Sequence, residues 1–560
     1  MRSAHPDYWA RRRTPAHTEF RRARDLLLSL RNDQDAAVDR FRWPRPAEFN
    51  WALEWFDVIA HGNHDPALVL IRPDGTADQV TFARMSAESD RTAGWFTALG
   101  VRRGDRVLVA LDARRELWEV ILACLKTGAV VVPTHCGLTR REAADRVRRG
   151  AISHVVCRDG DAPLFDGVAL PGRRIGVGGA AVREGWVRYE DRADEGPFLP
   201  GEATAADALA FCYFTSGTTS APKLVGHTHT SYPVGHLSSM YFNGLVPGDR
   251  HLNVSVPGWA KHSWSSFFVP WNAEATVVVP PDGPVGELPL ADWLLAHRVT
   301  SMCAPPSVWR ALSQRPDGVR PALREATSAG EPLDAELARR VRAAWNVPLR
   351  DGYGQTEATA LIGTSPGLPH RPGLLGKPLP GYRITLRSED GTTGARRGEI
   401  CVDLAQAPAG MMQGYLEAGK EARPPGQDGL YPTGDLGERD ESGYLRVLGR
   451  LDDVFKSAGH RVSPHEVEAA VNAHAAVAAS AVVPVPHPAG GAAPHAVVVP
   501  RADHPAGPEL ARTLLAHCQD LLPAHARPYS VSFTTDLPRT VSGKIRRRQV
   551  AAQLQEKEAL

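Results

Sequence analysis

The sequence has few cysteines and no long apolar run, and each scarcity excludes a class of protein. Its 7 cysteines are scattered through 560 residues, without the Cys-x-x-Cys spacing that zinc sites and redox motifs use. No stretch approaches the ~18 apolar residues of a membrane-spanning helix, and the first residues lack the apolar core of a signal peptide. We therefore expect a cytoplasmic protein with reduced thiols and no membrane span.

The chain also lacks an excess of charge of either sign. Its 65 Lys and Arg nearly balance 63 Asp and Glu, which gives a formal net charge of +2 at pH 7. This small charge predicts no nucleic-acid partner, because such partners need a strong basic footprint. The hydrophobic content of 43% is ordinary for a globular protein, and 560 residues exceed what one core holds. We expect two or more domains.

Strand-like and helical segments alternate in the first third of the chain. Asp105–Leu111 and Gly128–Pro133 have the apolar runs of buried strands, and Glu116–Leu125 between them has helical periodicity. The same rhythm continues at Ala151–Val156. This alternation predicts an α/β architecture with a largely parallel sheet.

One polar segment directly follows another apolar run. Leu209–Phe214 is predicted to be a short buried strand, and Thr-Ser-Gly-Thr-Thr-Ser-Ala-Pro-Lys223 comes after it. Backbone N–H groups, hydroxyls and one lysine in such a loop can surround a phosphate chain. The usual P-loop ends in Gly-Lys-Ser/Thr, whereas Pro222 precedes Lys223 here. From this segment alone, a phosphate-binding loop and a polar surface loop both remain open.

Four further regions place polar residues in turns: Asp351–Glu357, Tyr431–Asp435, Gly449–Arg461 and Pro538–Lys544. Glu357 offers an oxygen ligand for Mg²⁺, and Asp435 could accept hydrogen bonds from ribose hydroxyls. Lys544 lies in a turn that we expect to be exposed. Each region has an ordinary explanation as a turn when it is considered alone.

In this order and at these separations, the five regions resemble the adenylate-forming superfamily of acyl-CoA synthetases, adenylation domains and luciferases. Trp259 within Pro-Gly-Trp favours the medium-chain and aryl acyl-CoA synthetases. The resemblance implies a large N-terminal domain, residues 1–451, of parallel-type sheets layered with helices plus a β-barrel-like part. It further implies a small mobile C-terminal α+β domain, residues 452–560, with a hinge at Asp452. Residues 1–45 would form a helical extension.

The resemblance also assigns the nucleotide site. The catalytic residues would be Lys223, Thr356, Glu357 and Lys544, with Glu357 holding Mg²⁺ and Thr356 contacting the α-phosphate. Asp435 and Arg450 would bind the ribose, and Arg461 would anchor a phosphate or the hinge. The complete set implied to bind ATP or AMP is Thr215, Ser216, Gly217, Thr218, Thr219, Ser220, Lys223, Gly330, Glu331, Pro332, Asp351, Gly352, Tyr353, Gly354, Gln355, Thr356, Asp435, Arg450, Arg461 and Lys544.

The acid and CoA sites follow from the same resemblance. Lys261 and His262 beside an aromatic wall would be costly in a dry pocket, which favours an aromatic or functionalised acid. The residues implied to line the acid site are Trp259, Lys261, His262, Ala329, Gly330 and Gly354, and those implied to line the CoA channel are Ala458, Gly459 and His460. A surface position without CoA contact is an equal interpretation of His460.

The implied reaction is the activation of an aryl, arylacrylic or medium-chain acid by ATP and Mg²⁺. Pyrophosphate leaves an acyl adenylate, the C-terminal domain rotates and withdraws Lys544, and the acyl group passes to the CoA thiol. Three alternatives stay open: transfer to a carrier protein or an amine, activation of nitrite to diazotise an aromatic amine, and a silent nucleotide-binding homologue. The partners would be a small acid and CoA, and the chain a monomer or homodimer.

Overall fold

The computed structural model of the chain describes residues 12–179, 183–192, 198, 200–215, 222–281, 288–313, 322–417, 420–423, 426, 428–457, 460–487, 491–539 and 545–558. The chain divides into two compact units. The first consists of Met1–Leu333, Leu337–Arg383 and Asp403–Tyr431, and the second of Asp334–Glu336, Ile384–Val402 and Pro432–Leu560. The predicted boundary and hinge at Asp452 stay a prediction.

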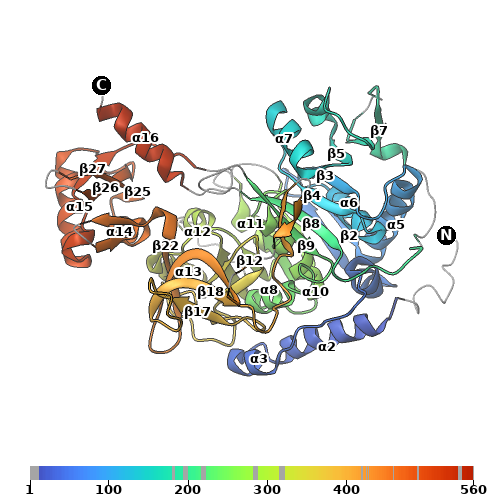
Figure 1. Cartoon of the computed structure of the whole chain (residues 1–560), viewed down its shortest axis with the longest axis horizontal. Coiled ribbons are helices and arrows are strands. Elements are labelled where there is room, and N and C mark those ends of the chain that lie inside the picture. The colour runs from blue at the N-terminus through green and yellow to red at the C-terminus, as the bar shows by residue number, and fades with distance from the viewer. Residues whose placement is uncertain are drawn as a thin grey trace. The chain divides into compact units, whose positions relative to one another are not determined.

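The first unit contains a nine-stranded sheet with a parallel part and an antiparallel part (Figure 1). Neighbours are parallel from β7 to β8 and antiparallel from β8 to β20. The order is β7 (Trp186–Arg188), β6 (Arg174–Val177), β5 (His154–Arg158), β3 (Arg106–Ala110), β4 (Val130–Pro133), β8 (Leu209–Thr215), β9 (Lys223–Thr228), β19 (Gly414–Glu417) and β20 (Lys420–Arg423).

Helix α6 (Arg115–Thr127) contacts β3 and β4, α7 (Arg140–Gly150) shares a core cluster with the sheet, and α5 (Phe82–Ala98) packs against α6. The predicted strands around residues 108, 131 and 156 and the helix between the first two are confirmed. Continuous Val and Leu runs form strands here because both faces of a parallel sheet are covered. Helix α7 begins with a capping box in which Thr139 and Glu142 satisfy each other's backbone N–H groups.

A second nine-stranded sheet lies in the same unit. Its strands are parallel from β14 to β1 and antiparallel at both edges. The order is β16 (Lys377–Pro378), β15 (Ala360–Gly363), β14 (Leu349–Gly354), β13 (Glu325–Ala329), β12 (Ser301–Cys303), β10 (Arg250–Asn253), β11 (Thr276–Val279), β1 (Pro66–Ile71) and β2 (Ala77–Thr81). Side chains of α11 (Leu290–Ala296), α12 (Pro306–Ser313) and α13 (Ala335–Trp345) share its core cluster.

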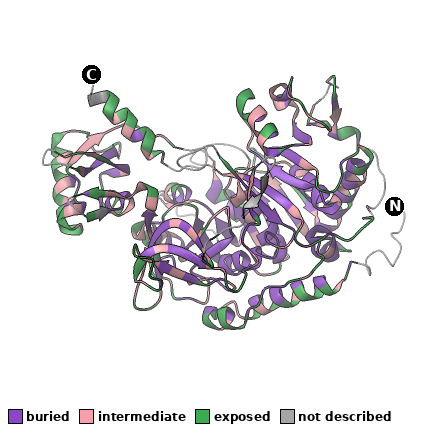
Figure 2. Ribbon diagram, in the orientation of Figure 1, coloured by how far each residue is buried: buried purple, intermediate pink, exposed green. Residues whose placement is uncertain are grey.

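The N-terminal segment packs on this unit through helices α2 (Pro15–Ser29) and α3 (Gln34–Arg40), and α2 contacts α8 (His236–Asn243). Figure 2 shows that α2 carries both buried and exposed residues, as an amphipathic helix does. The helix begins at Pro15 because Thr14 caps it, accepting a hydrogen bond from the His17 N–H. The aromatic segment that follows forms a π-helical turn, η1 (Ala52–Phe56), and α4 (Asp57–Ala60).

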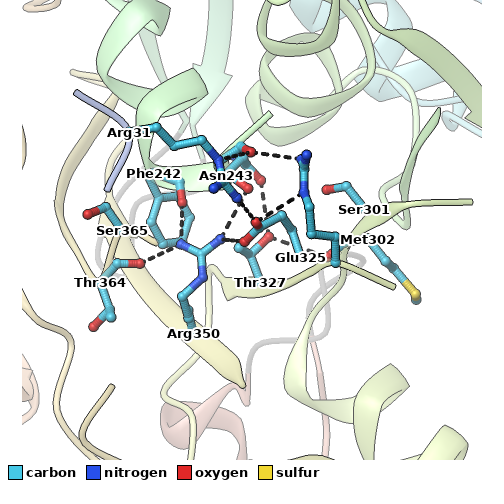
Figure 3. Close-up of polar contacts among 12 residues, drawn as sticks. Arg31, Phe242, Asn243, Ser301, Met302, Glu325, Thr327, Arg350, Thr364 and Ser365 are labelled. Atoms are coloured by element: carbon cyan, nitrogen blue, oxygen red, sulfur yellow. Dashed lines mark hydrogen bonds and ion pairs between the residues drawn. The ribbon is translucent and has the colours of Figure 1, made fainter. Parts of the chain in front are cut away.

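A buried ion network joins the N-terminal segment to strands β13 and β14 (Figure 3). The Glu325 carboxylate on β13 pairs with Arg31, which follows α2, and with Arg350 on β14. Arg350 also donates hydrogen bonds to the carbonyl groups of Phe242 and Thr364. Since a buried guanidinium without partners is strongly unfavourable, these contacts fix the strands whose carboxyl ends carry predicted site residues.

The second unit is built of two smaller sheets and three helices. The four-stranded sheet contains β17 (Ile384–Arg387), β18 (Arg397–Asp403), β21 (Leu430–Arg439) and β22 (Leu445–Arg450). The five-stranded sheet contains β24 (His460–Val462), β23 (Phe455–Ser457), β26 (Ala492–Pro500), β25 (Val477–Pro486) and β27 (Ser530–Phe533), accompanied by α14 (Pro464–Asn472), α15 (Pro508–Leu521) and α16 (Arg547–Glu558).

Short helical turns complete the described secondary structure. They are η2 (Asp159–Phe165), η3 (Tyr189–Asp191), α9 (Ala260–Ser263), η4 (Trp264–Phe268), α10 (Val269–Asn272), η5 (Leu451–Asp453) and η6 (Ala524–Ala526). The predicted α/β class, with a large sheet-and-helix domain and a small α+β domain, is confirmed. None of the helices in the described ranges is long and apolar enough to span a membrane.

Candidate active site

The β8–β9 hairpin places Lys223 at the start of β9, where the predicted phosphate loop ends. Strand β8 is buried over most of its length, as predicted, and Thr215 at its end pairs with Lys223 at the start of β9. Lys223 is exposed. The loop residues Ser216, Gly217, Thr218, Thr219 and Ser220 lie outside the described residues, so their phosphate contacts stay a prediction.

The carboxyl end of β14 carries the predicted Asp351–Glu357 turn, and packing requires both of its glycines. A Cβ at Gly354 would lie 2.3 Å from the Thr359 carbonyl oxygen. A Cβ at Gly352 would lie 2.4 Å from the ring of Phe242. Only glycine lets the backbone approach these neighbours so closely. The turn thereby brings Thr356 and Glu357 beyond the edge of the sheet.

A buried histidine that the sequence did not single out holds this turn. His227 on β9 makes a 2.7 Å hydrogen bond from Nε2 to the Thr356 carbonyl oxygen, and its Nδ1 lies 3.1 Å from the Ser231 hydroxyl. Burial lowers the pKa of His227 to about 4, so its ring is neutral at pH 7. A carbonyl only accepts, so Nε2 carries the proton and Nδ1 accepts from Ser231.

Glu357 and Lys223 both contact Tyr415 on β19. The Tyr415 hydroxyl donates to Glu357 Oε1 at 2.9 Å. The Lys223 Nζ lies 4.6 Å from the centroid of the Tyr415 ring, a cation–π distance. The Glu357 backbone carbonyl is fixed as well, because it accepts from the Met412 N–H at 2.8 Å. The structure therefore brings the predicted Lys223 and Glu357 together around a tyrosine that no sequence motif marked.

The carboxylate of Glu357 suits the predicted Mg²⁺. One oxygen receives the Tyr415 hydroxyl, and the other makes no hydrogen bond or ion pair with a described residue. Within the described ranges, no group of three or more His, Cys, Asp or Glu side chains is arranged around a common point. Mg²⁺ commonly binds through one or two carboxylates together with substrate phosphates, so a single free carboxylate oxygen fits it.

Asp351, predicted to bind ATP or AMP, is a buried carboxyl group. Burial raises its pKa to about 7, against the opposing effects of hydrogen bonds from the Gly352 and Leu333 N–H groups and of the nearby Lys261 charge. An unfolded Asp has a pKa of about 3.9. The folded chain therefore binds an extra proton between roughly pH 4 and pH 7, and its stability falls as pH rises through this window.

Replacing Asp351 with Asn will remove this pH dependence. Asn keeps an oxygen for the two backbone N–H groups, and it carries no charge to desolvate. As the pH rises from 4 to 8, the free energy of unfolding of the Asp351→Asn variant should increase relative to that of the unmodified chain by on the order of 2–4 kcal/mol. Urea unfolding midpoints of both proteins at the two pH values measure the change. A stability difference between the two proteins that is the same at pH 4 and pH 8 would contradict the raised pKa of Asp351.

Lys261 occupies the predicted acid pocket at the end of β13. Its Nζ donates to the Ala329 carbonyl oxygen at 3.0 Å. Gly330 follows with φ of 98°, and a Cβ there would meet nothing within 4 Å, so its conformation rather than crowding favours glycine. Ala329 thus contacts Lys261, and Gly330 follows it in the chain; that these residues line an acid pocket stays a prediction.

His262 and Trp259 lie next to Lys261 but face other groups. The His262 ring centroid lies 5.6 Å from that of Trp118, and burial lowers the pKa of His262 to about 3. Its nitrogens make no hydrogen bond with a described residue. The centroid of the Trp259 ring lies 6.1 Å from that of the His135 ring. A contact of His262 with the substrate therefore stays a prediction, and any such contact involves a neutral ring.

The predicted residues from Asp435 onward belong to the second unit. Asp435 and Arg450 pair across β21 and β22, with 3.5 Å between Oδ1 and Nη1. Asp452 is exposed, and the His460 ring stacks on that of His525 with 4.3 Å between centroids. Their roles toward the ribose, the hinge and CoA stay predictions. Lys544, Ala458, Gly459 and the Arg461 side chain lie outside the described residues.

Comparisons with known proteins show which family this chain resembles. A family model described as AMP-binding enzyme matches residues 56–416, and one described as AMP-binding enzyme C-terminal domain matches residues 466–544. The 4-hydroxybutyrate–CoA ligase 1 of Metallosphaera sedula is 35% identical over 520 residues, covering 91% of each chain. The mitochondrial acyl-coenzyme A synthetase ACSM3 of Homo sapiens is 30% identical over 532 residues, covering 91% of this chain and 90% of its own.

Solved structures resemble the whole chain. An acyl-CoA synthetase from Brucella canis superposes with a TM-score of 0.71 at 28% identity, covering 93% of this chain and 99% of its own. The anthranilate CoA ligase AuaEII, in complex with anthranoyl-AMP, superposes with a TM-score of 0.81 at 24% identity, covering 92% of this chain and 99% of its own. The second likeness concerns the fold alone. The cytoplasmic location and the oligomeric state stay predictions.

Proposed function

The chain belongs to the AMP-binding enzyme family as an acid–CoA ligase of the AMP-forming class, and we propose that its acid bears a hydrogen-bond acceptor remote from the carboxylate. The acid would be an aryl, arylacrylic or medium-chain molecule with such a substituent. ATP, Mg²⁺ and CoA complete the proposed reactants. The observation that carries the substrate class is the position of Lys261.

The proposed chemistry has two steps. A carboxylate oxygen of the acid attacks the α-phosphorus of ATP, the bond to the β-phosphate oxygen breaks, and pyrophosphate leaves. The CoA thiolate then attacks the acyl carbonyl carbon, and AMP leaves with the electron pair of the broken C–O bond. Lys223 would bind the leaving pyrophosphate, Thr356 would contact the α-phosphate, and Lys544 would stabilise the charge at the reacting oxygens. Mg²⁺ bound at Glu357 would neutralise phosphate charge.

Lys261 gives the proposed pocket an excess of hydrogen-bond donors. An ammonium group has three N–H donors, and its one hydrogen bond to the described chain goes to the Ala329 carbonyl. Trp264 lies three residues later, on the same side of this helical stretch, and its Nε1–H is buried without an acceptor among the described residues. Unpaired donors in a shielded site are unfavourable unless a ligand supplies acceptors.

A similar chain supports this class of acid. The Metallosphaera sedula relative is named for 4-hydroxybutyrate, whose hydroxyl lies at the end remote from the carboxylate. An acid of this kind would place an acceptor oxygen where the Lys261 ammonium has donors to spare. A plain alkyl chain would leave those donors unpaired, and the pocket would discriminate against it.

Replacing Lys261 with Met tests the substrate class, because Met is also an unbranched side chain, one atom shorter than Lys, and it lacks the donors. We expect kcat/KM to fall about 10- to 100-fold for acids with a remote hydroxyl or carbonyl, the usual cost of losing a charged hydrogen bond. The matched unsubstituted acids should react as before or faster. Initial rates of CoA-thioester formation with pairs such as 4-hydroxybutyrate and butyrate measure the ratio. An equal effect on both members of each pair would refute the proposed role.

A further inference from the structure

Tyr415 lies on β19, which pairs with β9 of the β8–β9 hairpin. In the antiparallel pair of β19 and β9, Tyr415 is opposite Val225. Lys223 is two residues from Val225, so its side chain emerges on the same face of the sheet. Diagonal neighbours on one face are within reach of long and aromatic side chains, which accounts for the 4.6 Å approach of the Lys223 ammonium to the ring.

The same tyrosine is the link between two opposite charges. Its hydroxyl donates to Glu357 at 2.9 Å, while its ring faces Lys223. Neither Lys223 nor Glu357 forms an ion pair with any residue in the described ranges. A lysine and a carboxylate this close to a common neighbour would attract each other, and a direct pair would occupy both groups.

We propose that Tyr415 is a positioning residue that keeps Lys223 and Glu357 apart and presents them separately to the nucleotide. The inference rests on the proposed function, in which Lys223 binds phosphate and Glu357 holds Mg²⁺. The ring holds the ammonium by its π face, which leaves the N–H donors free to rotate toward phosphate oxygens. The hydroxyl occupies one carboxylate oxygen and orients the other, which stays free for the metal.

The hydroxyl and the ring of Tyr415 should have separate effects, which different substitutions at this position can distinguish. The hydroxyl acts on the carboxylate, so its loss should weaken metal binding, as is usual when a hydrogen-bond partner of a metal-binding carboxylate is removed. The ring acts on the lysine, so its loss should weaken phosphate binding independently of the metal. A role in packing alone would affect stability and leave no such separation.

Calorimetric titration of the full chain with ATP, without acid or CoA, at a series of Mg²⁺ concentrations provides the test. For Tyr415→Phe we expect the Mg²⁺ concentration that half-restores ATP binding to rise about 10- to 100-fold, with an unchanged ATP Kd at saturating Mg²⁺. For Tyr415→Leu we expect the same metal shift and, in addition, an ATP Kd raised about 2- to 5-fold at saturating Mg²⁺.

Tyr241→Phe is the matched control, because the Tyr241 hydroxyl donates to the Leu30 carbonyl at 3.0 Å, and Leu30 is not a predicted site residue. It should leave both the metal dependence and the ATP Kd as they are. A metal dependence of Tyr415→Phe equal to that of the unmodified chain would overturn the inference about Tyr415. Absence of ATP binding by the unmodified chain would overturn the proposed function instead.

Discussion

Replacing Lys544 with alanine will slow acyl-adenylate formation by about 100- to 1000-fold. The expectation follows from the resemblance of the Pro538–Lys544 turn, which assigns this lysine to the carboxylate and the α-phosphate during adenylation. Negative charge accumulates between these groups as the new bond forms, and a fixed ammonium stabilises it more in the transition state than in the ground state. ATP–pyrophosphate exchange with a good acid substrate measures the step.

The effect should be confined to adenylation. A synthetic acyl adenylate supplied with CoA should react with the Lys544→Ala variant at nearly the rate of the unmodified chain, because the family resemblance implies that the lysine is withdrawn for thioester formation. Arg548→Ala removes an exposed positive charge four residues further on and should leave the exchange rate unchanged. Equal losses in both half-reactions, or undiminished exchange in a folded Lys544→Ala variant, would contradict the assigned role.

Replacing Glu357 with Gln will lower the adenylation rate by about 100- to 1000-fold at millimolar Mg²⁺. Gln keeps the volume of the side chain and can still accept the Tyr415 hydroxyl, but its neutral oxygen is a poor Mg²⁺ ligand. The metal would then have to bind through the phosphates alone. Exchange rates measured over a wide range of Mg²⁺ concentrations check this expectation.

Raised Mg²⁺ should partly restore the Glu357→Gln variant, since the defect lies in metal affinity. Thermal unfolding of the variant should match that of the unmodified chain, because the second carboxylate oxygen makes no hydrogen bond or ion pair with a described residue. A loss of activity that is the same at every Mg²⁺ concentration would argue against metal binding by Glu357. It would indicate that the carboxylate acts in another way.

The buried parallel strands around residues 108, 131 and 156 were predictable because their signal is local. Val- and Leu-rich runs such as Val130–Pro133 form buried parallel strands wherever helices cover both faces, and the sequence contains the whole pattern. The π-helical turns at Ala52–Phe56 and Trp264–Phe268 were not predictable. Their aromatic spacing resembles that of an α-helix. Trp51, directly before the first turn, and Phe267, in the second, both pack against Trp271, a contact between distant segments that no local pattern specifies.

The site was predictable only where its residues lie in one segment. The Asp351–Glu357 turn places its glycines, hydroxyl and carboxylate within seven neighbouring positions, so the pattern is visible in the sequence. His227 and Thr356 are 129 positions apart, and Tyr415 and Glu357 are 58 apart. Their contacts depend on the pairing of β9 with β19 and on the path of β14, which no local pattern specifies. An isolated tyrosine or histidine in a strand has no distinguishing signal.

The most direct test of the central claim is ATP–pyrophosphate exchange by the purified chain across a panel of aryl, arylacrylic and hydroxylated medium-chain acids, followed by the addition of CoA. We predict acid-dependent exchange that requires Mg²⁺, and conversion of the accumulated adenylate to a CoA thioester with release of AMP. No exchange with any acid, together with AMP formation from ATP, nitrite and an aromatic amine, would contradict the account.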